Sequence, residues 1–263
     1  MPCYQNKGQK LFYQVKPCKV DKKYPETIVF AHGSGGNSLS WSNQLEAFSN
    51  HYQCVVFDHR GFGRSHSQLP IVRVSDFKED LLCLMDHLDL GRVNLVGQSM
   101  GGYTSLRFAC DFPDRVQSLV LSSSNGLIDY GSNKTLLPAF QKIEGFKKIG
   151  KEWGWSKYSE ERTGLIERYN EIRKNNSDIN NGIVIFKKTE DDLLSLQRLK
   201  SVSCRTLVIG GEEDPLFPPS LLLECSKLFS NGHCKILKDV GHSPYIEAPE
   251  KFNNELRLHF ESK

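Results

Sequence analysis

The sequence predicts an α/β fold in which a mostly parallel central sheet is flanked by helices. Six short apolar runs, rich in β-branched residues, lead into turns rich in glycine, serine or aspartate, which is typical of strands buried on both faces. Stretches with helical spacing lie between these runs, and this alternation indicates an α/β sandwich. The six runs are Thr27–Ala31, Cys54–Phe57, Val93–Val96, Leu119–Leu121, Thr206–Ile209 and Lys235–Leu237.

Four stretches carry the apolar spacing of helices that pack on a sheet. In Ser75–Leu88, Ser75 can cap the first turn because acidic residues follow it. The others are Met100–Cys110, Leu221–Phe229 and Pro249–Phe260. The first 24 residues, which include Lys10–Val15, are expected to add an antiparallel hairpin at the sheet edge.

Residues 126–200 interrupt this rhythm. They are rich in Lys, Glu, Asn and Arg and show little strand pattern, so a helical insertion between two strands is expected. Within it, the apolar run Ile183–Phe186 is interpreted as helix or loop. The predicted organisation is therefore a core of residues 1–125 and 201–263, with residues 126–200 as a helical insertion.

Composition and charge argue against several classes of protein. The chain has 263 residues, 38% of them hydrophobic and 25% charged, which is ordinary for a globular protein. The net charge of +3, from 34 Lys and Arg against 31 Asp and Glu, comes without a dense basic stripe, so nucleic acid is not an expected partner. No apolar leader opens the chain and no apolar stretch reaches about 18 residues, so we expect a cytoplasmic protein without a membrane span.

The eight cysteines include no CxxC pair. Several lie inside apolar runs, which favours buried thiols in a reducing compartment over a zinc site or a disulfide framework.

The strongest chemical signal is Gly97–Gly101, read as Gly-Gln-Ser-Met-Gly. It fits the pattern G-x-S-x-G directly after a predicted strand and before a predicted helix, which is the context that a nucleophile elbow requires. Glycines at both ends allow strand and helix to approach closely. The pattern therefore predicts that Ser99 is a nucleophile exposed on a sharp turn.

A serine nucleophile needs a base, and the base needs an acid that orients it. His242 follows the last strand, and Asp214 follows the strand before it, so the chain order is serine, acid, histidine. Glu213 and Asp239 are the alternative acids. Asp214 is preferred because Pro215–Pro218 restart the chain into a helix, as this turn demands.

A glycine-rich loop, His32–Gly36, follows the first predicted parallel strand. Its backbone N–H groups, together with that of Met100, could stabilise an oxyanion. Ser34 is the preferred loop donor and Gly35 the second. A phosphate-binding loop is disfavoured because no Lys-Ser or Lys-Thr pair follows the glycines.

Together these motifs resemble the α/β-hydrolase superfamily, in particular its small enol-lactonases, esterases and carbon–carbon bond hydrolases. The resemblance covers roughly residues 25–125 and 203–262. It rests on His32–Gly35, Asp58–Ser65, Gly97–Gly102, Gly211–Asp214, Gly241–Pro244 and Glu247–Glu250.

The resemblance implies an α/β-hydrolase fold in which residues 126–200 form a helical cap. It also implies roles for several further residues. In such proteins His32 buttresses the oxyanion loop and Asp58–Ser65 is structural. Gly35 and Trp41 are candidates to border the substrate, although Trp41 could equally pack in the core. Trp153 and Trp155 either line a substrate channel or anchor cap helices. The remaining histidines, without motif support, are His51, His66, His87, His233 and His259.

The activity implied is hydrolysis of a small-molecule ester or lactone through an acyl-enzyme, with no metal or organic cofactor. An aspartate at position 99 would have indicated an epoxide hydrolase or dehalogenase. Cleavage of a carbon–carbon bond beside a ketone uses the same triad, but Ser243 stands where members of that group often carry an aromatic residue. A hydrolase-like small-molecule receptor is the alternative from another class, and the polar cap sequence disfavours it. Fold alone does not decide among these functions.

Overall fold

The apolar runs of the sequence become neighbouring strands of one sheet. A computed structural model describes residues 2–21, 23, 25–129, 131, 154–157, 159, 164–187 and 189–262, which form an eight-stranded sheet in the order β1-β2-β4-β3-β6-β7-β9-β10. The pairs β1–β2 and β2–β4 are antiparallel and the other neighbours are parallel, which confirms the predicted fold class and the N-terminal hairpin. These strands are β1 (Cys3–Asn6), β2 (Gln9–Lys16), β3 (Thr27–Ala31), β4 (Gln53–Phe57), β6 (Val93–Gln98), β7 (Val116–Ser122), β9 (Arg205–Gly211) and β10 (Gly232–Leu237).

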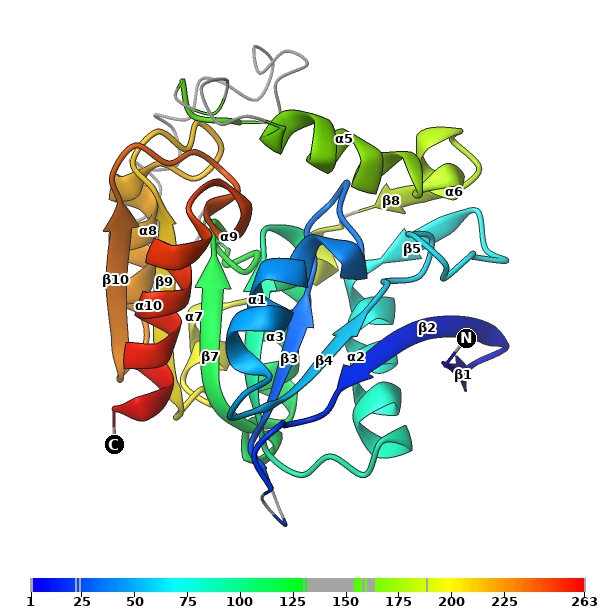
Figure 1. Ribbon diagram of the computed structural model, residues 1–263, viewed down its shortest axis with the longest axis horizontal. Coiled ribbons are helices and arrows are strands. Elements are labelled where there is room, and N and C mark those ends of the chain that lie inside the picture. Colours follow the sequence, from blue (N-terminus) through cyan, green and yellow to red (C-terminus); the bar gives the residue numbers. More distant parts are fainter. Residues whose placement is uncertain are drawn as a thin grey trace.

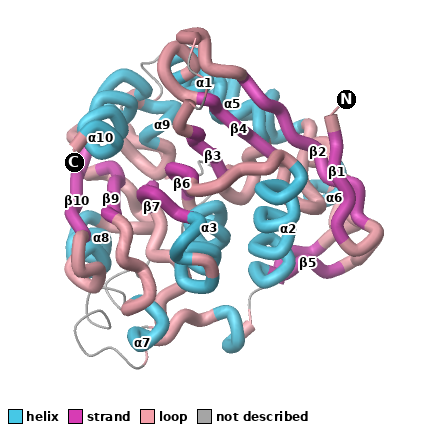
Figure 2. Tube along the Cα trace, turned by 90° about the horizontal axis from the view of Figure 1, so that it is seen from below, coloured by secondary structure: helices cyan, strands magenta, loops and turns pink. Residues whose placement is uncertain are grey.

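Alternate side chains of each parallel strand enter two hydrophobic cores, one on each face of the sheet. In β3, Val29 and Ala31 belong to one core, whereas Ile28 and Phe30 belong to the other. Figure 2 shows helices on both faces. The first face carries α2 (Val74–His87), α3 (Met100–Asp111) and α8 (Pro219–Ser226), and the second carries α1 (Ser42–Phe48) and α10 (Pro249–Glu261).

The four expected helices are present with ends that differ by a few residues. Helix α2 begins at Val74 rather than after a Ser75 cap. The cap comes instead from Asp76, whose carboxylate accepts the backbone N–H of Arg73 at 2.9 Å. Asp76 thus satisfies the N–H of Arg73, the residue before the helix, whereas a capping serine would have accepted an N–H from within the first turn.

The carboxyl ends of the parallel strands meet at one edge of the sheet, and helix α5 lies beyond them (Figure 1). In open α/β sheets this edge is where ligands bind. The division into core and cap stays a prediction. The remaining described elements are η1 (Ser38–Trp41), η2 (Pro113–Arg115), α5 (Leu165–Lys174), α6 (Ser177–Asn180), η3 (Glu190–Asp192), α7 (Leu196–Leu199) and α9 (Pro244–Glu247).

The interpretation of Ile183–Phe186 as helix or loop holds for Ile183 and Val184, which lie in a bend, but is wrong for Ile185 and Phe186, which belong to a strand. Strand β8 (Ile185–Lys187) pairs in parallel with β5 (Ile71–Arg73) in a separate two-stranded sheet. The backbone N–H of Ile185 donates to the carbonyl of Pro70 at 2.8 Å. Strand β8 depends on this distant partner, which local apolar spacing does not reveal.

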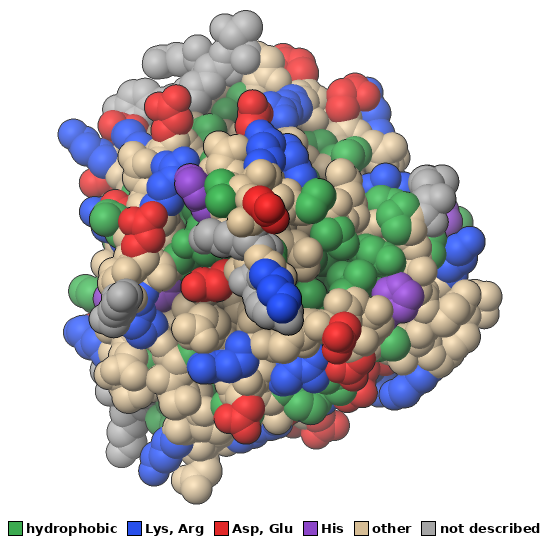
Figure 3. All heavy atoms as spheres, turned by 60° about the horizontal axis from the view of Figure 1, so that its bottom comes forward, with side chains coloured by type: hydrophobic (Ala, Val, Ile, Leu, Met, Phe, Trp, Pro, Cys, Tyr) green, Lys and Arg blue, Asp and Glu red, His purple; other side chains and the backbone are tan. Residues whose placement is uncertain are grey.

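The state of the cysteines and the distribution of surface charge can both be compared with the sequence analysis. All eight cysteines carry free thiols. On the face drawn in Figure 3, basic and acidic side chains are interspersed rather than gathered into one patch. Every described helix is too short or too polar to cross a lipid bilayer.

A buried histidine makes the fold sensitive to acid. The side chain of His259 lies in α10 beside His233, and burial lowers its pKa to about 3, with the nearby His233 and Arg205 acting in the same direction and the backbone of Leu119 opposing them. The unfolded chain takes up this proton near pH 6.5, so the stability that neutral His259 contributes is present above that pH and is lost as the pH falls towards 3.

We therefore expect the free energy of unfolding of the wild type to fall by about 2–3 kcal/mol more than that of His259→Phe between pH 7 and pH 4.5, because phenylalanine never takes up a proton. Urea unfolding at both pH values measures this difference. His51→Gln, a change at an exposed histidine, is the control and should match the wild type. Equal losses in the wild type and His259→Phe would contradict the prediction.

Candidate active site

Ser99 lies on the sharp turn between β6 and α3. Its φ of 49° and ψ of −112° are rare for a residue with a side chain. Three hydrogen bonds hold this backbone. The Ser99 N–H donates to the carbonyl of Ser122 at 2.9 Å, and the Ser99 carbonyl accepts the Ser124 hydroxyl at 2.8 Å and the Gly102 N–H at 2.9 Å. The strained turn is therefore fixed from both sides, and the Ser99 side chain remains half-buried.

Glycines let the elements around this turn approach one another. A Cβ atom on Gly101 would overlap the carbonyl oxygen of Ala31 in β3, and one on Gly97 would overlap the backbone of Gly101. Helix α3 can therefore begin directly beside β3 only because both positions lack a side chain.

Asp214 and His242 meet at the ends of β9 and β10. The Asp214 carboxylate accepts the backbone N–H groups of Leu216 and Phe217 at 2.8 and 3.0 Å through one oxygen. Its other oxygen lies 3.0 Å from His242 Nδ1. The imidazole also stacks on Phe217, with ring centroids 5.7 Å apart. The carboxylate is thus held in place, and it orients the ring so that Nε2 is available for another partner.

The two alternative acids lie elsewhere. Glu213 accepts the backbone N–H of Lys157 at 2.9 Å and lies 3.4 Å from its ammonium group. Asp239 occupies a left-handed turn after β10, with a φ of 62°. Among the three candidates considered in the sequence, Asp214 makes the hydrogen bond to His242.

Gln98 connects the serine turn to the histidine loop. Its side-chain amide donates to the carbonyl of His242 at 3.1 Å and is buried. Between the described Ser99 and His242 side chains themselves no hydrogen bond is formed. Such contacts are often long in an empty site and tighten when substrate binds.

The glycine-rich loop forms a four-residue turn. The Gly36 N–H donates to the carbonyl of Gly33 at 3.0 Å, and Gly35 takes a φ of 88°. A positive φ at the third residue of such a turn favours glycine. Ser34 is exposed and Gly35 buried, while Met100 opens α3, where backbone N–H groups have no partner within the helix.

His32 joins this loop to the loop after β4. Its Nδ1 lies 2.8 Å from the carbonyl of Gly33, and its Nε2 accepts the backbone N–H of His59 at 3.0 Å. Because Nε2 accepts, Nδ1 carries the proton and donates. Burial lowers the pKa of His32, against the opposing effect of the Gly33 bond, so the ring stays neutral and both hydrogen bonds persist.

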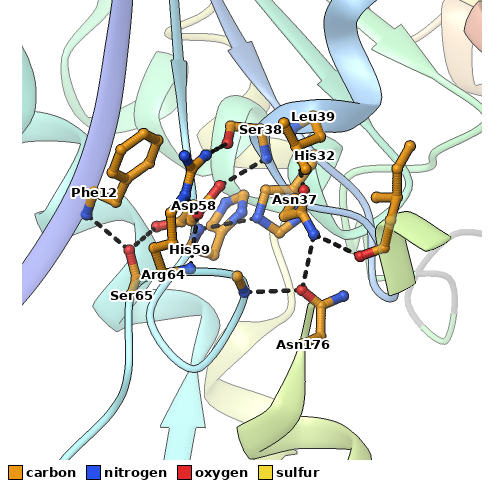
Figure 4. Close-up of polar contacts among 12 residues, drawn as sticks. Phe12, His32, Asn37, Ser38, Leu39, Asp58, His59, Arg64, Ser65 and Asn176 are labelled. Atoms are coloured by element: carbon orange, nitrogen blue, oxygen red, sulfur yellow. Dashed lines mark hydrogen bonds and ion pairs between the residues drawn. The ribbon is translucent and has the colours of Figure 1, made fainter. Parts of the chain in front are cut away.

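Asp58 holds the chain directly after the glycine-rich loop (Figure 4). Its carboxylate accepts the backbone N–H of Ser38 at 2.7 Å and that of Arg64 at 2.9 Å. The guanidinium of Arg64 in turn donates to the hydroxyl of Ser38 at 2.7 Å. Through these bonds, the segment Asp58–Ser65 supports the chain that follows the glycine-rich loop.

Glu247 was not singled out from the sequence as a site residue. This buried carboxylate accepts the backbone N–H groups of Gly241 at 3.0 Å and Ser243 at 2.9 Å, which flank His242. It also accepts the N–H of Ser156 at 3.1 Å. The motif segment Glu247–Glu250 pointed to this position, but only the folded chain reveals what the carboxylate touches.

Trp41 packs in the core rather than against open space. Its ring is fully buried between Phe30 and Tyr245, with ring centroids 5.0 and 4.5 Å away. The sequence left two roles open for Trp41, and the position of its ring agrees with packing in the core.

The cap tryptophans have different outcomes. Trp153 lies outside the described residues. Trp155 is half-buried and makes an edge contact with Tyr169, with ring centroids 5.0 Å apart. Tyr169 also lies beside the glycine-rich loop, since a Cβ atom on Gly35 would be 3.4 Å from its hydroxyl. Burial raises the pKa of Tyr169 to about 12, with nearby Arg173 opposing, so this hydroxyl stays protonated at neutral pH.

Comparison with known proteins finds relatives whose sequences are similar over most of this chain. A protein of Rhizobium rhizogenes, provisionally named carbamate hydrolase RutD, is 25% identical over 90% of this chain and 93% of its own length. A 2-hydroxy-6-oxononadienedioate/2-hydroxy-6-oxononatrienedioate hydrolase of Burkholderia vietnamiensis is 27% identical over 87% of this chain and 84% of its own.

Solved structures share the fold over nearly the whole chain. Est816, described as an N-acyl homoserine lactone degrading enzyme, superimposes with a TM-score of 0.75 at 25% identity over 98% of this chain and 99% of its own. The enol-lactonase of Burkholderia xenovorans LB400 has a TM-score of 0.78 at 21% identity over 99% and 100%. The family model described as alpha/beta hydrolase fold matches residues 26–249, and the chain is therefore a hydrolase of the alpha/beta hydrolase family.

Proposed function

We propose that this hydrolase cleaves a carboxylic ester or lactone, with Ser99 as nucleophile, His242 as base and Asp214 as the residue that orients the base. The observation that carries this proposal is the 3.0 Å bond between Asp214 and His242 Nδ1, at the sheet edge where β6 presents Ser99 on its strained turn. Nucleophile, base and orienting acid are the three parts that such acyl transfer requires.

The hydrogen bond to Asp214 favours the tautomer that leaves His242 Nε2 without a proton. Nε2 then takes the proton of Ser99 as the hydroxyl oxygen attacks the carbonyl carbon, and Asp214 stabilises the imidazolium that forms. His242 returns the proton to the leaving alkoxide, which gives an acyl-enzyme. Water, deprotonated by His242, attacks this ester and releases the acid and free Ser99.

Backbone N–H groups stabilise the oxyanion in both steps. The candidates are Met100, at the N-terminus of α3, and Ser34, with Gly35 second, in the turn after β3. Removing one such donor from a serine hydrolase typically raises the barrier by about 3–4 kcal/mol.

A second candidate is cleavage beside a ketone with the same triad. The Burkholderia vietnamiensis relative, whose name specifies an oxo acid substrate, favours it. Ser243 argues against it, as does the lactone-degrading neighbour Est816. The discriminating observation is which class of substrate turns over.

We expect the wild type to hydrolyse members of a p-nitrophenyl ester series from acetate to decanoate, and Ser99→Ala to lose at least about 10³-fold in kcat, because the nucleophilic oxygen is gone. Ser203→Ala, at an exposed serine, is the matched control and should behave as the wild type. Release of p-nitrophenolate is the measurement, and the chain-length profile reports the size of the pocket.

Equal turnover by Ser99→Ala and wild type would show that Ser99 is not the nucleophile. Turnover of a vinylogous diketone but of no ester or lactone would favour the second candidate.

Asp214→Asn should lower kcat by about 10³–10⁴-fold, because asparagine cannot favour the required tautomer or stabilise the imidazolium. The same change of charge at the neighbouring position, Glu213→Gln, should leave kcat close to that of the wild type, since Glu213 faces Lys157. Steady-state kinetics on the best ester compare the two variants. A larger effect at Glu213 would transfer the orienting role to that residue.

A further inference from the structure

Asn176 stands directly before α6, in the part of the chain assigned to the cap, yet its side chain is buried against loops of the sheet edge. Its amide nitrogen donates to the carbonyl oxygens of Gly35 at 2.8 Å and Gly36 at 3.1 Å. Its amide oxygen accepts the backbone N–H of Gly63 at 2.8 Å and the side-chain amide of Asn37 at 3.2 Å. Figure 4 shows Asn176 between these loops.

These four bonds use the full hydrogen-bonding capacity of an amide, which has two N–H donors and an oxygen with two lone pairs. A carboxylate of the same shape offers acceptors only. The oxygen that replaces the amide nitrogen would face the carbonyl oxygens of Gly35 and Gly36 and repel them, while the other oxygen could still accept the N–H of Gly63. The site is therefore built for asparagine rather than for any polar residue of that size.

The bonds act on the peptide group that joins Gly35 to Gly36. Asn176 holds its carbonyl, and the carbonyl of Gly33 holds its N–H at 3.0 Å. With that peptide plane held at both ends, the preceding N–H groups of Ser34 and Gly35 have little freedom to rotate. These are the loop donors assigned to the oxyanion.

We propose that Asn176 is a positioning residue through which the cap sets the geometry of the oxyanion loop. This inference rests on the proposed function, since it assigns the loop the task of binding an oxyanion. Asn176 touches no reacting atom and acts through Gly35 and Gly36. Its loss weakens stabilisation of the transition state and leaves binding of the ground state largely intact.

Neighbouring contacts keep α6 in place when Asn176 is changed. The Asp178 carboxylate lies 2.9 Å from the His66 ring nitrogen and accepts the N–H of Ser67 at 3.1 Å. Asn37 also donates to the carbonyl of Ile172 at 2.8 Å. A substitution at Asn176 therefore disturbs the oxyanion loop while other bonds still join the cap to the core.

The experiment compares Asn176→Asp with Asn175→Asp, the same change at the adjacent exposed residue. Kinetics on the best p-nitrophenyl ester are expressed per active site, with sites counted by fluorophosphonate labelling of Ser99. We expect Asn176→Asp to lower kcat by about 10- to 100-fold, as a small misplacement of catalytic groups does, with KM changed by less than about threefold. Asn175→Asp should match the wild type.

Hydrogen–deuterium exchange of the peptide Gly33–Ser40 provides a readout that needs no turnover. Exchange should be faster in Asn176→Asp than in the wild type or Asn175→Asp, because the turn is no longer held. Unchanged exchange, kcat per site within twofold of the wild type, or an effect confined to KM would each overturn the inference. Activity that survives Ser99→Ala would instead overturn the proposed function, and exchange would still report whether Asn176 holds the loop.

Discussion

Helix α3 can approach β3 closely only because Gly101 has no side chain, and the geometry of the site depends on this contact. A Cβ atom at Gly101 would overlap the carbonyl of Ala31, and one at Gly97 would overlap Gly101 itself. The close fit forces the chain through the left-handed conformation of Ser99. It also places the N-terminus of α3, with its partial positive charge, directly beside Ser99.

The loops around this turn lie beyond the ends of the strands. Their backbone N–H and C=O groups therefore lack the hydrogen bonds that neighbouring strands make with each other. Buried polar groups without partners are costly, and each loop here is supplied with partners by a buried side chain. His32 and Asp58 serve the loop after β3, Glu247 serves the loop of His242, and Asn176, directly before α6, serves Gly35 and Gly36. The same bonds that remove this cost fix the positions of the backbone donors.

Tertiary context overrode local pattern at particular residues. Ile183 and Ile185 remain exposed, and their segment still becomes part of an extended pair because the short strand at Ile71 lies beside it. For Trp41 no expectation was overridden: the sequence left open a place near substrate or in the core, and the ring is fully enclosed between aromatic neighbours. In each case the deciding partner lies far away in the chain, and local spacing carries no record of it.

The order of the strands in the main sheet and of their flanking helices, the turn at Ser99, and the candidates Asp214 and His242 could be predicted from the sequence. This was possible because buried strands need apolar runs and sharp turns need glycine, and both requirements are local. The hydrogen bond that joins the preferred acid, Asp214, to His242, and the contacts through which Asn176 and Glu247 hold the neighbouring loops, are visible only in the folded chain. Those contacts join residues from distant parts of the chain. Hydrogen bonds between them form only when folding brings donor and acceptor close together, and local sequence patterns do not record this.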